Sequence, residues 1–69
     1  MRVLRVATVL DAPLAEVSAA TEGIASTARL AQTAAGVLVT LERRPGWAAR
    51  RRTLRALQRD LVTLATRCR

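Results

Sequence analysis

The sequence predicts a small α+β protein in which an antiparallel sheet of about three strands packs under a long C-terminal amphipathic helix. Apolar residues near the C-terminus recur at alternating steps of three and four, which is helical spacing. This stripe consists of Leu54, Leu57, Leu61, Leu64 and Cys68. Residues 37–41 combine valine, leucine and threonine, a composition typical of a strand. Between these two segments, Pro45 and Gly46 mark a turn at residues 43–46.

The N-terminal third predicts a strand followed by a short helix. Residues 2–10 are rich in β-branched residues and alternate, which favours a strand. Its two faces would carry Leu4, Val6 and Leu10 on one side, and Val3, Ala7 and Val9 on the other. Asp11 and Pro13 end this pattern, and proline is well tolerated at the first position of a helix. Residues 13–22 therefore predict a short helix, which Gly23 would stop.

Residues 26–42 allow two interpretations. As a hairpin, strands over residues 26–32 and 37–42 would flank a turn in which Gly36 adopts a positive φ. As one helix, the segment would form a second apolar seam against the C-terminal stripe, giving an antiparallel helical hairpin. Gly23 and Gly36 would each destabilise that helix by about 1 kcal/mol relative to alanine. We therefore expect strands.

The last helix is expected to supply most of the stability. It is predicted over residues 47–68, and its core-packing or partner-packing residues are Trp47, Leu54, Leu57, Leu61 and Leu64. Burial of each such side chain contributes roughly 1.5–3 kcal/mol before the loss of conformational entropy. Replacing Leu57 or Leu61 with alanine should therefore be among the most destabilising changes. Arg50 falls on the same stripe, so its guanidinium must reach solvent or an acidic partner.

The size and composition of the chain point to association rather than catalysis. A single domain of 69 residues buries little apolar surface, and one cysteine without histidine excludes an intrachain disulfide and leaves few metal ligands. A three-stranded sheet also leaves an unpaired edge that can pair with another chain. We expect a homo-oligomer or a partner protein. No catalytic, cofactor-binding or metal-binding residues are predicted, and Cys68 is interpreted as a small apolar filler.

The basic residues form one candidate site. All twelve are arginine, against five acidic residues, which gives a net charge of +7. Arg51, Arg52, Arg55 and Arg59 would lie on the side of the last helix away from the leucines. Like charges four residues apart destabilise a helix by a few tenths of a kcal/mol, and an anionic partner would relieve this repulsion. The simpler interpretation is a solvated surface in an arginine-rich composition.

The N-terminal residues do not resemble an export signal. Asp11, Pro13 and Glu16 interrupt the apolar run that a secretory signal needs, and no segment approaches the length of a transmembrane span. We therefore expect a cytoplasmic protein in which Cys68 is a reduced thiol.

Three stretches resemble parts of a larger domain. Residues 6–17 read VATVLDAPLAEV, residues 27–42 include GVLVTLE, and residues 51–64 include LRALQRDLVTL. They are similar to the first strand and helix, the last hairpin and the long closing helix of the SRPBCC superfamily of START-like, polyketide-cyclase-type helix-grip domains. The middle strands of that family have no counterpart here, and Ser18 stands where the family commonly has tryptophan. The chain therefore resembles a shortened version of the family fold.

Two functions from different classes follow. The resemblance implies a non-catalytic or vestigial module that binds a hydrophobic small molecule and self-associates. The charge implies instead a basic protein that docks its C-terminal helix on nucleic acid or an anionic membrane. The aromatic residues that stack on bases are nearly absent, since Trp47 is the only one. A shortened reading frame without retained activity is a third interpretation.

Overall fold

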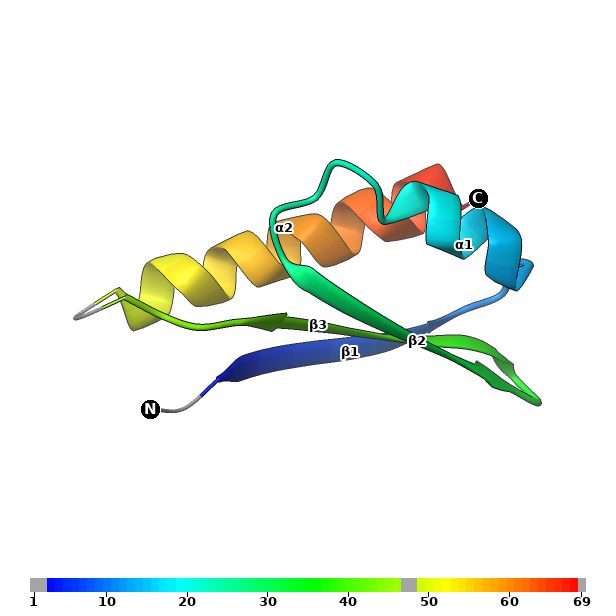
Figure 1. The fold of residues 1–69 in the computed structure, drawn as a ribbon, viewed down its shortest axis with the longest axis horizontal. Helices are drawn as coiled ribbons and strands as arrows, with labels where there is room; N and C mark the ends of the chain where they lie inside the picture. Colours follow the sequence, from blue (N-terminus) through cyan, green and yellow to red (C-terminus); the bar gives the residue numbers. More distant parts are fainter. Residues whose placement is uncertain (1–2, 47–48, 69) are drawn as a thin grey trace.

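The computed structural model describes residues 3–46 and 49–68 and arranges them as three strands and two helices (Figure 1). In chain order the elements are β1 (Leu4–Leu10), α1 (Leu14–Ala20), β2 (Thr27–Thr33), β3 (Gly36–Arg43) and α2 (Arg50–Arg67). The predicted α+β fold with a long closing helix is confirmed. The alternative helical hairpin is not formed, because residues 27–33 and 36–43 pair with each other as strands.

The elements begin and end within a few residues of the predicted positions. The short helix ends at Ala20 rather than residue 22, and the Thr21 hydroxyl donates a hydrogen bond to the Ser18 carbonyl in the turn that follows. Arg43 belongs to β3 rather than to the predicted turn, because it still pairs with Leu4. The last helix begins at Arg50, and Trp47 lies outside the described residues.

β3 is the central strand of the sheet, whose order is β1-β3-β2 with both neighbours antiparallel. The register places Leu41 between Val6 and Ala28, so these residues share one face. The tight turn between β2 and β3 depends on Gly36, whose φ is 137°. A Cβ at this position would collide with the Leu10 carbonyl oxygen, so the turn requires glycine.

The core lies between α2 and one face of the sheet, and both helices lie on that side (Figure 1). Val39 and Leu41 of β3 and Leu57 and Leu64 of α2 are fully buried there. Val17 extends this core beneath α1. Because large side chains of the central strand meet the leucines of α2 directly, the contact between helix and sheet carries most of the apolar burial.

The opposite face of the sheet is open. Val9 is 46% exposed on this face, and Ala7 is also exposed, whereas Val6 packs against the core on the helix side. On this face the Glu42 carboxylate forms ion pairs with Arg5 at 3.1 Å and with Arg29 at 3.5 Å. The two outer strands are thus linked across the central strand by one carboxylate.

Candidate anion-binding site

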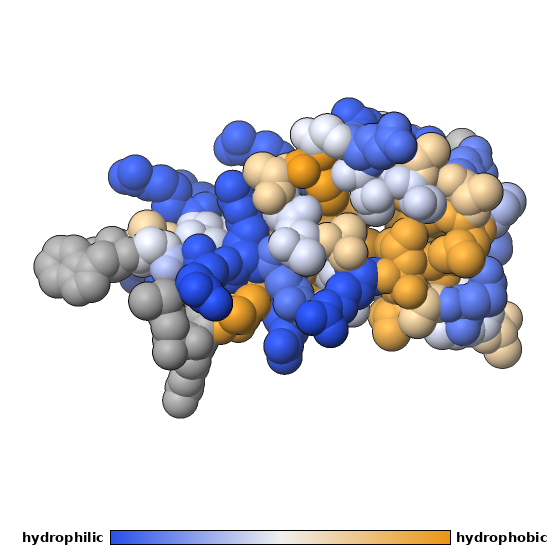
Figure 2. Space-filling view, viewed as in Figure 1, coloured by the Kyte–Doolittle hydropathy of each residue, from blue (hydrophilic) through white to orange (hydrophobic). Residues whose placement is uncertain are grey.

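The net charge of the protein is concentrated in one segment. Residues 43–59 contain seven arginines and no acidic residue, and the other five arginines of the chain are matched by its five acidic residues. We call these seven side chains the arginine end; they are Arg43, Arg44, Arg50, Arg51, Arg52, Arg55 and Arg59. Figure 2 shows hydrophilic residues over the N-terminal half of α2 and apolar residues gathered beside α1. The molecule is therefore polarised along its length.

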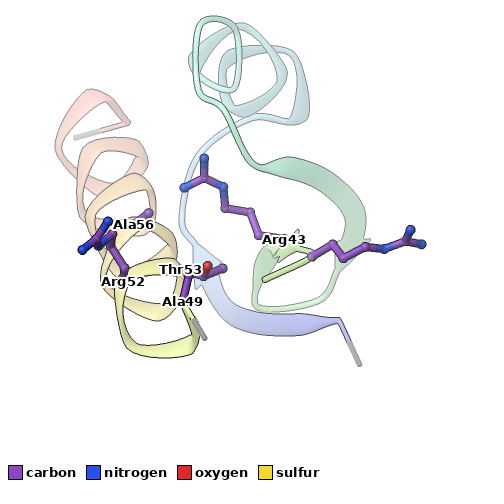
Figure 3. Close-up of a pocket in the computed structure, with 6 residues that line it drawn as sticks. Arg43, Ala49, Arg52, Thr53 and Ala56 are labelled. Carbon is purple, nitrogen blue, oxygen red and sulfur yellow. The ribbon is translucent and has the colours of Figure 1, made fainter. Parts of the chain in front are cut away.

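Two elements bring these arginines together. Arg43 closes β3, Arg44 follows it, and the chain then returns as the first turns of α2. A surface hollow of about 250 Å³ forms between them and is lined by Arg43, Arg44, Ala49, Arg52, Thr53 and Ala56. In Figure 3 Arg43 lies on the sheet side of this hollow and Arg52 on the α2 side. The lining of the hollow therefore includes arginines from both sides.

The start of α2 adds to the positive potential. The N-cap residue, Ala49, makes no side-chain capping hydrogen bond, and the first turn contains no acidic residue. The first backbone N–H groups of a helix lack intrahelical partners and carry a partial positive charge. Arg50, Arg51 and Arg52 occupy this turn, where acidic residues are normally favoured. The local arrangement is therefore unfavourable without a nearby anion.

The arginine end has no acidic partner among the residues that the structure describes. Across residues 3–46 and 49–68, the ion pairs involve Arg5 and Arg29, and none involves the arginine end. Arg67 at the far end of α2 donates hydrogen bonds to the carbonyls of Ala20 and Glu22. Arg5, Arg29 and Arg67 thus make contacts within the fold, whereas the arginine end remains open to solvent.

The structure places the predicted anion-binding residues together on α2. Arg51, Arg52, Arg55 and Arg59 are all exposed. Arg50 is exposed as well, so it reaches solvent although it falls on the same stripe as the leucines. Sequence reasoning assigned Arg43 and Arg44 only to a turn and missed their place in the site. The absence of any acidic residue from position 43 to 59 was the signal that could have identified them.

The packing residues divide into two groups. Leu57 and Leu64 are fully buried, Leu61 is half-buried against the core, and Leu54 is 38% exposed. Trp47 lies outside the described residues, so its predicted role is not described. Leu64 rather than Leu61 therefore joins Leu57 as the most buried leucine of the helix. The helix is anchored less firmly at Leu54, near the arginine end.

A polar contact on the buried face of α2 was also missed. The Ser26 hydroxyl donates a hydrogen bond to the Asp60 carboxylate at 2.5 Å, and Ser26 is buried. Asp60 is three residues from Leu57 and four from Leu64, which places it on the same side of the helix. That spacing was the available sign that Asp60 faces the sheet side rather than solvent.

Three further observations concern the described residues. Burial, and to a smaller extent the Glu16 carboxylate, raises the pKa of the Cys68 thiol, which therefore stays protonated near neutral pH and is a poor nucleophile. No group of three His, Cys, Asp or Glu side chains in residues 3–46 and 49–68 could hold a metal ion. Within the same residues, neither helix is long and apolar enough to cross a membrane.

Comparison with known proteins gives no relative from which to transfer a function. No protein-family model, curated protein or solved structure matches this chain.

Proposed function

We propose that this protein is a non-catalytic interaction module that binds the phosphate backbone of nucleic acid through its arginine end. The observation that carries the proposal is the segregation of the whole net charge of +7 into residues 43–59, where none of the arginines has an acidic partner among the described residues. A polyanion would neutralise this charge and release counterions, which is the main source of sequence-independent affinity for nucleic acid.

The geometry of α2 suits a linear array of phosphates. Arg51, Arg55 and Arg59 are four residues apart, so they form one exposed row with a step of about 6 Å along the helix axis. One strand of B-form DNA presents a phosphate about every 3.4 Å along its axis. The row therefore spans several phosphates, and Arg43 and Arg44 line the hollow beside the first turns of α2.

The burial of the apolar face of α2 within the protein favours nucleic acid over an anionic membrane as the ligand. An interfacial helix binds a bilayer by burying that face among the lipids. Leu57 and Leu64 are instead buried against the sheet of the protein itself. Membrane binding would then rely on charge alone, whereas phosphate-backbone recognition requires only charge and reach. The scarcity of aromatic residues supports binding that does not depend on base sequence.

The hydrophobic ligand implied by the family resemblance stays a prediction. In a shortened helix-grip domain, the ligand would lie between the closing helix and the sheet. Leu57, Leu64, Val39 and Leu41 fill this interface with fully buried side chains. A hydrophobic small molecule would have to displace them, so we do not favour it. We also propose a cytoplasmic location, where nucleic acid is accessible and Cys68 stays reduced.

The proposal is tested by fluorescence anisotropy with a labelled 20-base-pair DNA duplex. If four or five phosphates are contacted, raising the salt from 50 to 200 mM should weaken binding by roughly 10²- to 10³-fold. The triple variant R51Q/R55Q/R59Q should bind at least about tenfold more weakly at low salt, because three phosphate contacts are lost. Far-UV circular dichroism and urea unfolding establish that the variant is folded.

The alternatives give different results. Tighter binding to phosphatidylserine-containing vesicles than to the duplex would replace nucleic acid with a membrane. Binding of a hydrophobic dye that survives both high salt and the triple substitution, without duplex binding, would favour the hydrophobic-ligand module. Absence of duplex binding at 50 mM salt would leave the arginine end as a solvated surface and refute the proposal.

A further inference from the structure

The free edge of β1 and the flank of α2 above it form one continuous surface. β1 is an outer strand, because β3 is its only neighbour in the sheet of the described residues. Its seven residues contain no proline, and its only charged residue is Arg5. The unpaired N–H and C=O groups of such an edge are a template for another strand. Native edges are usually protected by several charges, a proline or a bulge, and β1 has little of this protection.

Contacts on the other flank of α2 show which side faces the free edge of β1. Asp60 bonds to Ser26 at the start of β2, and Arg67 bonds to the carbonyls of Ala20 and Glu22 after α1. These contacts place α1 and β2 on one flank of α2. The other flank, above β1, carries a stripe at helical spacing. That stripe consists of Leu54, Gln58, Leu61 and Ala65.

This second flank is apolar and incompletely covered. Leu54 is 38% exposed, Val62 beside the stripe is 65% exposed, and Leu61 is half-buried. Leu54 and Val62 are the exposed large hydrophobic residues of α2 among the described residues. They lie on the side of the helix that has no packed neighbour among the described elements. An exposed apolar helix flank beside an unpaired strand edge is the kind of surface that another protein chain covers.

We propose that two copies of this protein associate through antiparallel pairing of β1 with β1 of the second copy. The exposed flanks of their α2 helices then pack together above the two paired strands. The sheet would then have six strands, with β1 no longer at an edge. A twofold axis through Ala7 pairs residues of the same face. Leu4 lies opposite Leu10, Arg5 opposite Val9, and Val6 opposite Thr8. No like charges are opposed, and the helices of both copies lie on the same side of the sheet.

The spacing of the elements fits this arrangement. α2 contacts both β1 and β3, so it lies above these two strands. With strands about 4.8 Å apart, a helix centred between β1 and β3 lies about one strand spacing from the twofold axis. The two helix axes are then roughly 10 Å apart, close to the distance at which packed helices interdigitate. Leu54 of one copy can meet Val62 of the other if Gln58 lies near the axis.

The distribution of charge favours the antiparallel orientation. Arg43 pairs with Leu4, so the arginine end lies at the start of β1. Asp11 and Glu16 follow the other end of β1, and neither makes an ion pair among the described residues. Antiparallel pairing brings the arginine end of one copy beside the acidic end of the other. It also separates the two arginine ends, which would repel each other in a parallel arrangement.

The test uses a cysteine cross-link on the twofold axis. Directly opposed residues in antiparallel strands have Cα atoms about 4.5–5.5 Å apart, which a disulfide can span. The variant A7C/C68S should therefore form a covalent dimer rapidly on mild oxidation. The matched control is A31C/C68S, because Ala31 is also exposed, on the same open face, but in the other outer strand. The control should remain largely monomeric under the same conditions.

Two further measurements complete the test: sedimentation of the wild-type protein, and association of variants with opposite charges at position 7. The wild-type chain should sediment as a dimer at tens of micromolar. Ala7→Lys and Ala7→Glu should each raise the dimer Kd by roughly five- to tenfold, because like charges then face each other, and an equimolar mixture should restore association. A monomeric wild-type chain, equal cross-linking of both cysteine variants, or failure of the mixture to recover would each overturn the proposal. None of these outcomes depends on nucleic-acid binding.

Discussion

The two ends of α2 are used differently. At its C-terminal end, Leu64 is fully buried and Arg67 donates hydrogen bonds to two carbonyls near α1. At its N-terminal end, the first turn lacks a side-chain cap and an acidic residue, and Leu54 is 38% exposed. One half of the helix therefore holds the fold. The other half carries exposed positive charge, which lowers the stability of the free protein.

The largest expected effect is on stability, when a leucine is replaced with alanine in each half of α2. Leu64→Ala should lower the free energy of unfolding by about 2–5 kcal/mol, because it removes a fully buried side chain and leaves a cavity. Leu54→Ala should lower it by about 1 kcal/mol or less, since that leucine already contacts solvent. Urea unfolding followed by circular dichroism measures both. Equal losses would show that the helix is anchored uniformly along its length.

A smaller effect is expected from the polar contact beneath the middle of α2. Ser26→Ala removes the hydroxyl that donates to Asp60, and leaves that half-buried carboxylate without its hydrogen bond. The free energy of unfolding should fall by about 1–3 kcal/mol. Thr63→Ala is the matched control, because its hydroxyl bonds only to the Arg59 carbonyl within the same helix. A loss for Thr63→Ala as large as for Ser26→Ala would show that the Asp60 contact is unimportant.

Introducing an acidic residue should have opposite effects at the two ends. Arg51→Glu places a carboxylate in the first turn and creates a favourable pair with Arg55, so stability should rise by about 0.5–1.5 kcal/mol. The same substitution should weaken duplex binding. Thr66→Glu, in the last turn, should instead lower stability by about 0.3–1 kcal/mol. Thermal unfolding at low salt measures both, and a stability loss for Arg51→Glu would contradict the view that the N-terminal half is electrostatically strained.

The smallest expected effect concerns Cys68. Burial and the Glu16 carboxylate raise the pKa of its thiol, so at pH 8 the folded protein should hold less thiolate than the unfolded chain. Alkylation by iodoacetamide should therefore be slower in buffer than in urea. Glu16→Gln should increase the folded-state rate modestly, because the repulsion is removed while access to the sulfur is unchanged. Alkylation as fast in buffer as in urea would contradict a raised pKa in the folded protein.

The sequence was sufficient to predict the fold because local signals and packing agree. The valines of residues 37–41 favour a strand, and Gly36 is the residue its turn requires. The spacing of the leucines identified the buried face of α2 but did not rank its members. Leu61 proved half-buried and Leu64 fully buried, since the angle at which a helix crosses a sheet is set by tertiary packing.

The candidate site was predicted only in part, because one element was considered at a time. Arg51, Arg55 and Arg59 share a helix face, and that relation is visible in the spacing of the sequence. The approach of Arg43 to the first turns of α2 depends on how the chain returns after β3, which no local pattern specifies. The Ser26–Asp60 contact is likewise a tertiary feature, because it joins residues 34 positions apart.

The most direct test of the central claim compares the salt dependence of duplex binding in two variants with the same change in charge. Arg55 belongs to the arginine end, whereas Arg29 lies on the open face of the sheet and pairs with Glu42. If the arginine end contacts the phosphates, R55Q should reduce the slope of log K against log salt by about 0.9, and R29Q should leave it nearly unchanged. Equal reductions would show that binding responds only to total charge, and would contradict a dedicated binding surface at the arginine end.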